Sequence, residues 1–182
     1  MKENELILAI TGSCGAVIAD AIMERSTSPV SIIATDWGKQ IYEKESGSFD
    51  KFSQKACKVY SNSNLSASIA SGSYKTKAMI IAPCSTNTMA KIASGICDNL
   101  VTRAAHCHLK EKRPLILCIR ESPWTLMMIE NAKTITLGGG VIAPISLPYY
   151  LQGNLDSLVS AYADRILSLT GQECKTPWEP DV

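Results

Sequence analysis

Short unbroken apolar runs alternate along the chain with stretches in which apolar residues have helical spacing. The unbroken runs are rich in Ile, Val, Leu and Ala, which is typical of buried strands. We expect strands at residues 5–11, 30–34, 77–82, 114–119 and 141–143. The helical spacing predicts helices at 16–25, from 35 or 36 to about 44, at 89–94, from 98 or 99 to about 112, at 125–132 and at 155–169. Residues 46–76 are rich in Ser, Asn, Lys and Gly and have the least regular pattern, with a short element expected at 58–60.

Buried strands that alternate with helices indicate a parallel sheet covered on both faces. We therefore expect a single-domain α/β fold, Rossmann-like or flavodoxin-like, over residues 1–171, followed by an extended tail at 172–182. In such folds ligands bind outside the carboxyl ends of the strands. That rule selects the four loops at 12–15, 35–37, 83–88 and 120–124.

The composition excludes some classes of function. The chain of 182 residues has 18 basic and 17 acidic side chains, so a nucleic-acid binder held mainly by charge is not expected. No apolar run approaches the roughly 18 residues of a membrane span. The apolar stretch near the N-terminus is too short, and its surroundings too acidic, for a signal peptide. We expect a protein of the cytoplasm with no membrane partner.

The cysteines and histidines do not form a recognisable metal site. The seven cysteines are odd in number and include no CxxC pair, which argues against a disulfide framework or a thiolate zinc site. The sequence His106-Cys107-His108 resembles a ligand cluster at first sight. On a helix each residue turns by about 100°, so the two imidazoles point about 200° apart. We predict that the protein holds no metal.

Small polar and charged residues fill the selected loops. GSCG at 12–15 lets backbone N–H groups approach an oxyanion at a helix start. CSTNT at 84–88 offers small polar side chains at another helix start, although N-capping by Ser85 or Thr86 also explains it. The segment 120–124 brings Arg, Glu and Trp to one strand end, where a plain ion pair is the alternative interpretation. Without GxGxxG or GxxxxGK[ST], these loops favour a mononucleotide over NAD or a nucleoside triphosphate.

Three segments resemble the flavin prenyltransferases of the UbiX/Pad group, within the flavin-containing, homo-oligomeric decarboxylase-like proteins. They are ITGSCGA at 10–16, the segment 70–124, and PISLPYYLQGNLDSL at 144–158. The most specific part is LKEKRPLILCIRESP at 109–123. The resemblance implies a metal-independent enzyme that transfers a dimethylallyl group from dimethylallyl phosphate, in some members the diphosphate, to reduced FMN. It also implies a dodecamer with active sites at subunit contacts, and a UbiD-type decarboxylase that receives the prenylated FMN.

The resemblance also assigns roles to individual residues. The positions that match FMN-binding residues are Gly12, Ser13, Cys14, Thr35, Ser85, Thr86, Asn87, Thr88 and Arg120. The positions that match holders of the prenyl phosphate are Arg103, Lys110, Tyr150 and Arg165. The positions that match carboxylates in proton handling are Glu45 and Glu121. Cys14 stands where the family usually has serine, so its thiol is expected to affect catalysis.

Each basic residue also has a plain interpretation, and other functions remain open. Lys110 ends a helix, where the dipole favours positive charge, and Arg165 lies on a surface-type helix. The segment 83–100 also resembles FMN-dependent peptidyl-cysteine decarboxylases, although their PxMNxxMW hallmark is absent and 120–123 stands in its place. A flavin reductase of small pterin-like molecules and a non-catalytic flavin-binding homologue are further alternatives. Turnover of dimethylallyl phosphate distinguishes the prenyltransferase from all three.

Overall fold

The computed structural model describes residues 4–151 and 153–176, and its centre is one sheet of six parallel strands in the order β3-β2-β1-β4-β5-β6. The strands are β1 (Leu6–Ile10), β2 (Val30–Ala34), β3 (Lys58–Ser61), β4 (Ala78–Cys84), β5 (Leu115–Ile119) and β6 (Val141–Pro144). Strand β1 pairs with β2 on one side and with β4 on the other, so the strand order reverses between β1 and β4. Such a reversal is where ligands bind in open α/β sheets.

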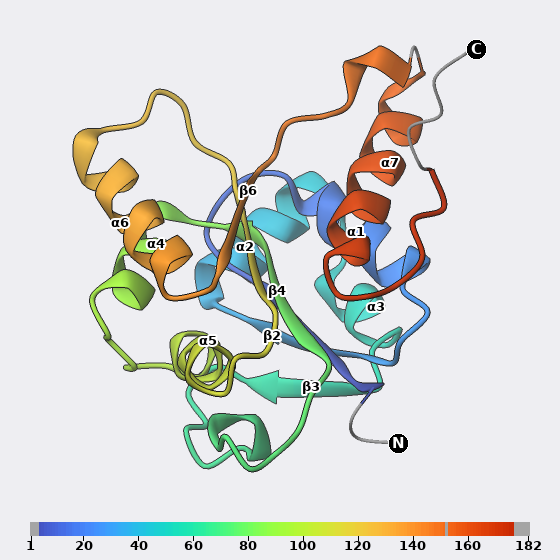
Figure 1. Ribbon diagram of the computed structural model, residues 1–182. Helices are drawn as coiled ribbons and strands as arrows, with labels where there is room; N and C mark the ends of the chain where they lie inside the picture. The colour runs from blue at the N-terminus through green and yellow to red at the C-terminus, as the bar shows by residue number, and fades with distance from the viewer. Residues whose placement is uncertain (1–3, 152, 177–182) are drawn as a thin grey trace.

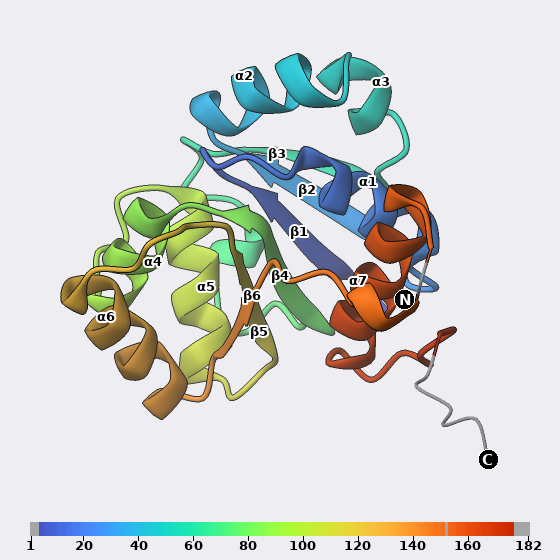
Figure 2. The ribbon, with the colours of Figure 1, turned by 90° about the horizontal axis from the view of Figure 1, so that it is seen from above.

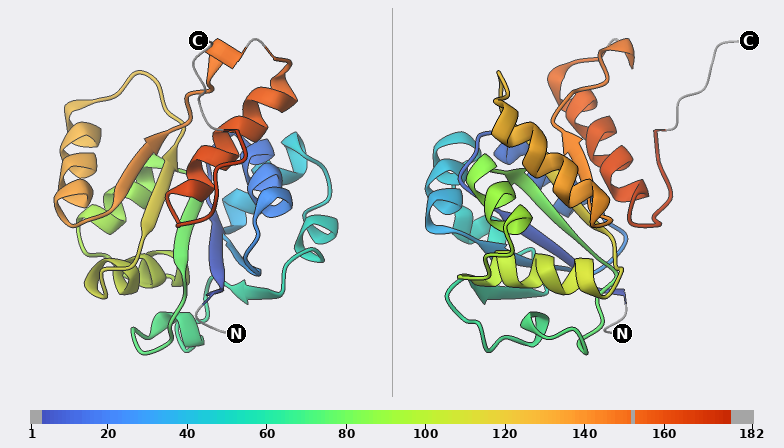
Figure 3. Two further views of the ribbon diagram at one scale, coloured as in Figure 1. Left: turned by 45° about the vertical axis from the view of Figure 1, so that its right-hand side comes forward. Right: turned by 60° about the vertical axis from the view of Figure 1, so that its left-hand side comes forward.

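Seven α-helices cover the two faces of this sheet. They are α1 (Ala16–Arg25), α2 (Asp36–Glu45), α3 (Phe49–Ser53), α4 (Thr86–Ala93), α5 (Leu100–Lys110), α6 (Leu126–Leu137) and α7 (Leu155–Ser168). Helices α1 and α7 lie side by side on one face, and α4, α5 and α6 lie on the other (Figure 1, Figure 2). The two views of Figure 3 show the same separation of α6 from α7. Two short 3₁₀ turns, η2 (Ser68–Ala70) and η3 (Tyr149–Leu151), lie in the connections. This arrangement is the expected Rossmann-like or flavodoxin-like α/β fold.

Strand β1 shows why the predicted strands are continuous apolar runs. Leu6, Leu8 and Ile10 pack in the core cluster with α1 and α7. Ile7 and Ala9 point the other way and pack in the cluster with α4 and α5. No side chain of the strand is more than 1% exposed. A strand buried on both faces has no polar alternation, so its sequence is unbroken.

The expected elements differ from the observed ones mainly at their ends. Strand β4 continues through Pro83 to Cys84, two residues beyond the prediction, because Cys84 pairs with Ile119 of β5. The short element expected at 58–60 is the edge strand β3, and α3 was not predicted. Helix α6 continues to Leu137 and α5 stops at Lys110. Residues 172–176 contain neither helix nor strand, and the rest of the predicted tail lies outside the described residues.

The two histidines of α5, His106 and His108, have different surroundings. His108 is 1% exposed, its Nε2 lies 2.9 Å from the Thr76 hydroxyl, and its Nδ1 lies 2.9 Å from the Ala104 carbonyl oxygen. His106 is half-buried. Among residues 4–151 and 153–176, no three His, Cys, Asp or Glu side chains gather closely enough to hold a metal ion. In the same described ranges, no helix is long and apolar enough to cross a membrane.

Burial of His108 predicts a pH-dependent contribution to stability. Burial is the main cause that lowers the pKa of His108 from 6.5 to about 4, with Arg113 as a smaller cause. His108 therefore binds a proton near pH 6.5 in the unfolded chain but not in the folded chain. The stability that the neutral, buried His108 allows is lost as the pH falls from 6.5 toward 4. Between pH 7 and pH 5, the free energy of unfolding should fall by about 2 kcal/mol more in the wild type than in the His108→Gln variant.

Urea denaturation at the two pH values measures this difference. The matched control is His106→Gln, which removes the half-buried imidazole of the same helix, so a change found only in His108→Gln is assigned to the buried imidazole. The same pH dependence in His108→Gln and the wild type would contradict the account.

Candidate functional site

Loops from the carboxyl ends of three strands meet around one cavity of about 370 Å³. The cavity wall is formed by Gly12, Ser13, Cys14, Ile41, Lys44, Glu45, Ser85, Thr86, Arg120 and Glu121. Residues 12–14 follow β1, Ser85 and Thr86 follow β4, and Arg120 and Glu121 follow β5. The end of α2 contributes the remaining wall. The structure thus brings together three of the four loops that the sequence selected.

The buried side chain of Thr11 connects two of these loops. Its hydroxyl donates to the Pro83 carbonyl oxygen at 3.1 Å and accepts from the Ser85 backbone N–H at 2.8 Å. Its own backbone N–H also donates to Pro83. The third loop is attached by Ser13, whose hydroxyl donates to the Arg120 carbonyl oxygen at 3.1 Å. The prediction missed Thr11, whose only signal was its position as the last residue of the first apolar run.

Glu45 binds the first turn of α1 from the end of α2. Its Oε2 accepts from the backbone N–H groups of Gly15 at 2.8 Å and Ala16 at 2.9 Å. Gly15 has φ 109, a left-handed conformation that favours glycine. Two backbone N–H groups at a helix start thus hold one carboxyl oxygen of Glu45 in a fixed position. The predicted proton-handling residue is therefore oriented at the cavity wall.

The loops after β2 and β4 also act as helix caps. Thr35 Oγ1 accepts from the Gly38 N–H at 3.0 Å, and Thr35 does not line the cavity. Ser85 Oγ accepts from the Thr88 N–H at 3.2 Å and donates to Thr88 Oγ1 at 3.0 Å. Of the predicted FMN-binding residues, Gly12, Ser13, Cys14, Ser85, Thr86 and Arg120 form the cavity wall, whereas Thr35, Asn87 and Thr88 lie outside it. Thr35 caps α2, Thr88 is buried beside Ser85, and Asn87 is exposed in the first turn of α4.

Gly12 and Gly38 allow β1 and α2 to approach closely. A Cβ on Gly12 would lie 2.9 Å from Cβ of Trp37, and a Cβ on Gly38 would lie 2.4 Å from the Ile10 carbonyl oxygen. The Trp37 side chain is 70% exposed beside this contact. In this loop the Ser13 backbone N–H donates to the Thr11 carbonyl oxygen at 2.7 Å, and the N–H groups of Gly15 and Ala16 donate to Glu45. The small residues of the first loop therefore leave room for the ring edge or phosphate of a mononucleotide beside Gly12 and Cys14.

Arg120 and Glu121 do not neutralise each other. In the part of the chain that the structure describes, no ion pair joins the two side chains. Glu121 Oε1 accepts from the Ser122 backbone N–H at 3.1 Å, and the Glu121 carbonyl oxygen accepts from Trp124 Nε1 at 2.9 Å. The Arg120 guanidinium is exposed at the cavity. This geometry favours ligand binding over the plain ion pair that the sequence left open.

A second cavity of about 390 Å³ lies between the segment after β6 and α7. Tyr150 and Arg165, the predicted phosphate holders, both line it. The segment after β6 also reaches the first loop, since Ile145 Cδ1 lies 3.3 Å from the position of a Cβ on Gly15. The next residue, Ser146, lines the second cavity. The two cavities are therefore joined by one short stretch of chain.

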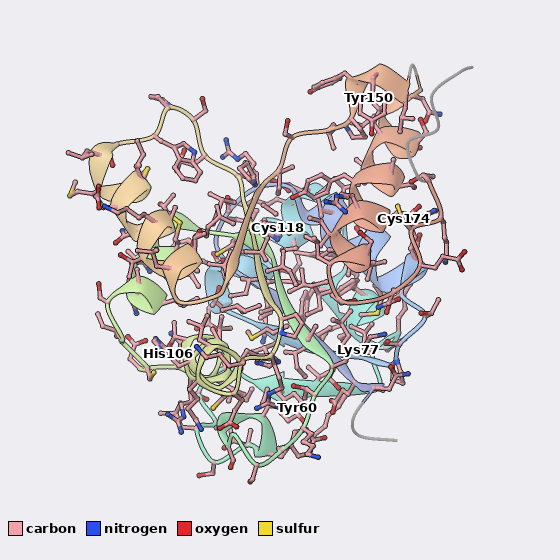
Figure 4. The ribbon with its side chains drawn as sticks, in the orientation of Figure 1. Tyr60, Lys77, His106, Cys118, Tyr150 and Cys174 are labelled. Atoms are coloured by element: carbon pink, nitrogen blue, oxygen red, sulfur yellow. The ribbon has the colours of Figure 1, made fainter. Side chains whose placement is uncertain are left out.

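Arg103 and Lys110, the other two predicted phosphate holders, lie away from both cavities. Arg103 Nε donates to the Ala70 carbonyl oxygen at 2.9 Å, and Lys110 pairs with Glu111. Both residues belong to α5, on the face of the sheet opposite α1 and α7. Figure 4 shows this separation, with His106 of α5 on one side of the molecule and Tyr150 and Cys174 beside α7 on the other. Within one chain, the expected four-residue phosphate site is only half assembled.

Comparison with known proteins gives consistent matches. A family model described as Flavoprotein matches residues 1–136. A flavin prenyltransferase UbiX from Deinococcus radiodurans is 32% identical over 171 residues, which cover 91% of this chain and 88% of that protein.

Two solved structures are similar along almost the whole chain. The crystal structure of AnUbiX (PadA1) in complex with FMN and dimethylallyl pyrophosphate has a TM-score of 0.94 at 27% identity and covers 98% of each chain. A dodecameric FMN-dependent UbiX-like decarboxylase from Escherichia coli O157:H7 has a TM-score of 0.91 at 31% identity, covering 97% of this chain and 99% of that one.

Removal of the Thr11 hydroxyl tests how strongly the loops are tied together. The Thr11→Val variant keeps the side-chain shape but leaves the Ser85 N–H without its partner. We expect the free energy of unfolding to fall by about 1–3 kcal/mol, the cost of an unsatisfied buried donor. Urea denaturation measures it, with Thr136→Val on the exposed side of α6 as the matched control. A Thr11→Val variant as stable as that control would contradict the proposed role of Thr11.

Proposed function

This chain belongs to the flavoprotein family, and we propose that it is a flavin prenyltransferase of the UbiX type. It joins the dimethylallyl group of dimethylallyl phosphate to reduced FMN, giving prenylated FMN and phosphate. The observation that carries the proposal is the cavity in which the loops after β1, β4 and β5 meet, together with a second cavity that contains Tyr150 and Arg165 and is reached by the segment after β6. A nucleotide site and a phosphate-donor site next to each other are what this reaction requires.

The first cavity is the proposed FMN site. The backbone N–H groups of Gly12 and Cys14 and the hydroxyl of Thr86 are proposed to supply short polar contacts around it, and Arg120 adds a cation. Thr35, Asn87 and Thr88 are proposed to contribute at its edge through the helix starts that they shape. When bound, reduced FMN supplies the electron-rich ring atoms to which the dimethylallyl group is attached.

The second cavity is the proposed site of the donor phosphate. Transfer breaks the allylic carbon–oxygen bond, and the electron pair of that bond leaves with the phosphate. Arg165 Nη1 donates to the Ser168 hydroxyl oxygen, which leaves the other N–H groups of the guanidinium for the phosphate oxygens. Tyr150 can donate one further hydrogen bond. Charge-assisted hydrogen bonds of this kind stabilise the charge that develops on the leaving group.

We further propose that Arg103 and Lys110 complete the phosphate site from a neighbouring copy of the chain. Both lie on the opposite face of the sheet from Arg165, and the E. coli relative is dodecameric. Of the twelve residues of α6, only Ile135 is buried, whereas Leu126, Met127 and Leu137 are more than 70% exposed. Large exposed apolar patches mark protein contacts. We therefore propose a homo-oligomer, a dodecamer as in that relative, with sites shared between copies.

Glu45 and Glu121 are the proposed groups for proton handling. Attachment of the dimethylallyl group as a new ring releases protons, so the site needs a base. Oε2 of Glu45 accepts from two backbone N–H groups, which orients the side chain. Glu121 lies on the cavity wall with its carboxylate fixed by the Ser122 N–H. The two carboxylates are thus positioned by backbone contacts rather than by flexible cations.

Cys14 is proposed to act where the FMN cavity meets the contact between Glu45 and Gly15. Its half-buried side chain lines the FMN cavity, one residue before the Gly15 that Glu45 contacts. A thiol is a weaker hydrogen-bond donor than a hydroxyl, so Cys14 is expected to orient its neighbours less strongly than a serine would. We also propose that residues 1–171 form one catalytic domain, that the enzyme works in the cytoplasm, and that a UbiD-type decarboxylase receives its product.

Mass spectrometry of the flavin tests the proposed reaction. We expect the purified protein, incubated without oxygen with reduced FMN and dimethylallyl phosphate, to release a flavin heavier by one C5 isoprenoid unit. The control is the double variant Tyr150→Phe/Arg165→Gln, which should reduce the rate at least 100-fold because the leaving phosphate loses a hydrogen bond and a cation. Unmodified FMN from folded, flavin-loaded protein, with the diphosphate also inert, would contradict the prenyltransferase and favour the decarboxylase, reductase or non-catalytic alternatives.

Subunit mixing tests whether sites are shared. Arg103→Ala and Arg165→Ala should each be nearly inactive alone, because each lacks one phosphate contact. Co-expressed and assembled together, they should regain up to about a quarter of the wild-type activity, since some sites then receive both arginines from intact copies. Mixed assemblies that stay as inactive as either parent would contradict a site shared between copies.

A further inference from the structure

The wall of the donor cavity includes residues from the end of the described chain. Cys174 and Thr176 line it together with Tyr150 and Arg165. We call residues 172–176 the C-terminal strap. We propose that the strap forms an ordered part of the wall of the donor site, and that Arg25 and Asp164 are positioning residues that hold it there. The proposal rests on the proposed function, because it assumes that the donor occupies this cavity.

An ion pair between two helices anchors one end of the strap. Arg25, at the end of α1, donates from Nε to Asp164 Oδ1 at 2.6 Å and from Nη2 to Oδ2 at 2.5 Å. Asp164 of α7 is 1% exposed. A bidentate pair of this kind fixes both side chains in one geometry. It therefore offers a rigid base on which a chain segment can be placed.

The strap is bound to both members of that pair. The Thr176 hydroxyl donates to Asp164 Oδ2 at 3.0 Å. Lys175 Nζ donates to the Arg25 backbone carbonyl oxygen at 3.0 Å. The two contacts flank the pair from successive residues of the strap. A change in the pair consequently shifts the residues that line the cavity, although neither Arg25 nor Asp164 lines it.

The start of the strap is fixed independently. The buried side chain of Gln172 accepts from the Thr27 backbone N–H at 2.7 Å and from the Thr27 hydroxyl at 2.8 Å. The Gln172 amide also reaches the hydroxyls of Ser26 and Thr170, each at 3.4 Å. With both ends attached, Cys174 is held between them at the cavity wall. The strap is thus part of the folded surface of the donor site.

Asp164 directly precedes Arg165 in α7, so the Arg25–Asp164 ion pair can affect how the donor binds. Successive side chains of an α-helix point about 100° apart. In α7, Asp164 is buried and holds the strap, while Arg165 is exposed and lines the cavity. The strap then stands opposite Arg165 and limits the space beside its guanidinium. A donor phosphate bound to Arg165 and Tyr150 is expected to cover the Cys174 thiol. The FMN cavity shares no wall residue with the strap, so flavin affinity should not depend on it.

Thiol labelling of the FMN-loaded wild type tests the proposal directly. Oxidised FMN is used, so that added dimethylallyl phosphate binds without transfer. We expect N-ethylmaleimide to label Cys174 at least fivefold more slowly when the donor is saturating, as read by peptide mass spectrometry. Cys57, an exposed thiol just before β3, is the internal control, and its labelling should not change.

A conservative variant separates positioning from general stability. Thr176→Val removes the hydrogen bond to Asp164 while keeping the side-chain shape. We expect KM for dimethylallyl phosphate to rise about three- to tenfold, with kcat, FMN affinity and Tm close to the wild type. Ser53→Ala, which removes a hydroxyl contact at the end of α3, is the control and should change none of them. Asp164→Asn should raise KM further, and it should also lower Tm.

The outcomes distinguish this proposal from the proposed function. If the enzyme turns over the donor but Cys174 labels equally fast with and without it, the strap is not a wall of the donor site. A Thr176→Val variant that weakens FMN binding or kcat as much as KM would likewise assign the strap a structural role only. If neither turnover nor protection is seen, the proposed function itself fails.

Discussion

The hydroxyl of Thr11 is the contact on which the arrangement of the site depends. It sits where the strand order reverses, and it accepts from Ser85 while donating to Pro83. Connections from β1 and β4 leave the sheet toward opposite faces, so their loops would separate without a link across the strand ends. Ser13 extends the link to β5 through the Arg120 carbonyl oxygen. Loops from three strands are thereby held around one cavity.

The elements that depend on local pattern could be predicted from the sequence, and those that depend on distant contacts could not. The buried strands and three of the site loops follow from unbroken apolar runs and from the polar residues after them. Helix α3, which was not predicted, lies in a Ser-rich segment and owes its order to packing, as Phe49 and Phe52 against Tyr42 show. In the same segment a short element was expected at 58–60, which is the edge strand β3. The cap that Glu45 places on α1 joins residues 29 and 30 positions apart, and no local pattern indicates it.

The predicted phosphate-binding residues divide in the same way. Tyr150 and Arg165 meet in one cavity because η3 and α7 follow each other on the same side of the sheet. Arg103 and Lys110 match the family pattern equally well, yet α5 carries them on the other face. Sequence similarity aligns residues along a chain and does not state which copy of the chain supplies them. A site assembled between copies reconciles the family pattern with the fold of one chain.

We propose that the flavin occupies the cavity at the carboxyl ends of β1, β4 and β5, and that the prenyl donor occupies the cavity between the segment after β6 and α7. The most direct measurement is a crystal structure of the protein with oxidised FMN and dimethylallyl phosphate bound. The account predicts FMN against residues 12–14, Ser85 and Arg120, with the donor phosphate between Tyr150 and Arg165. A flavin bound elsewhere, or a donor phosphate that contacts neither Tyr150 nor Arg165, would contradict it.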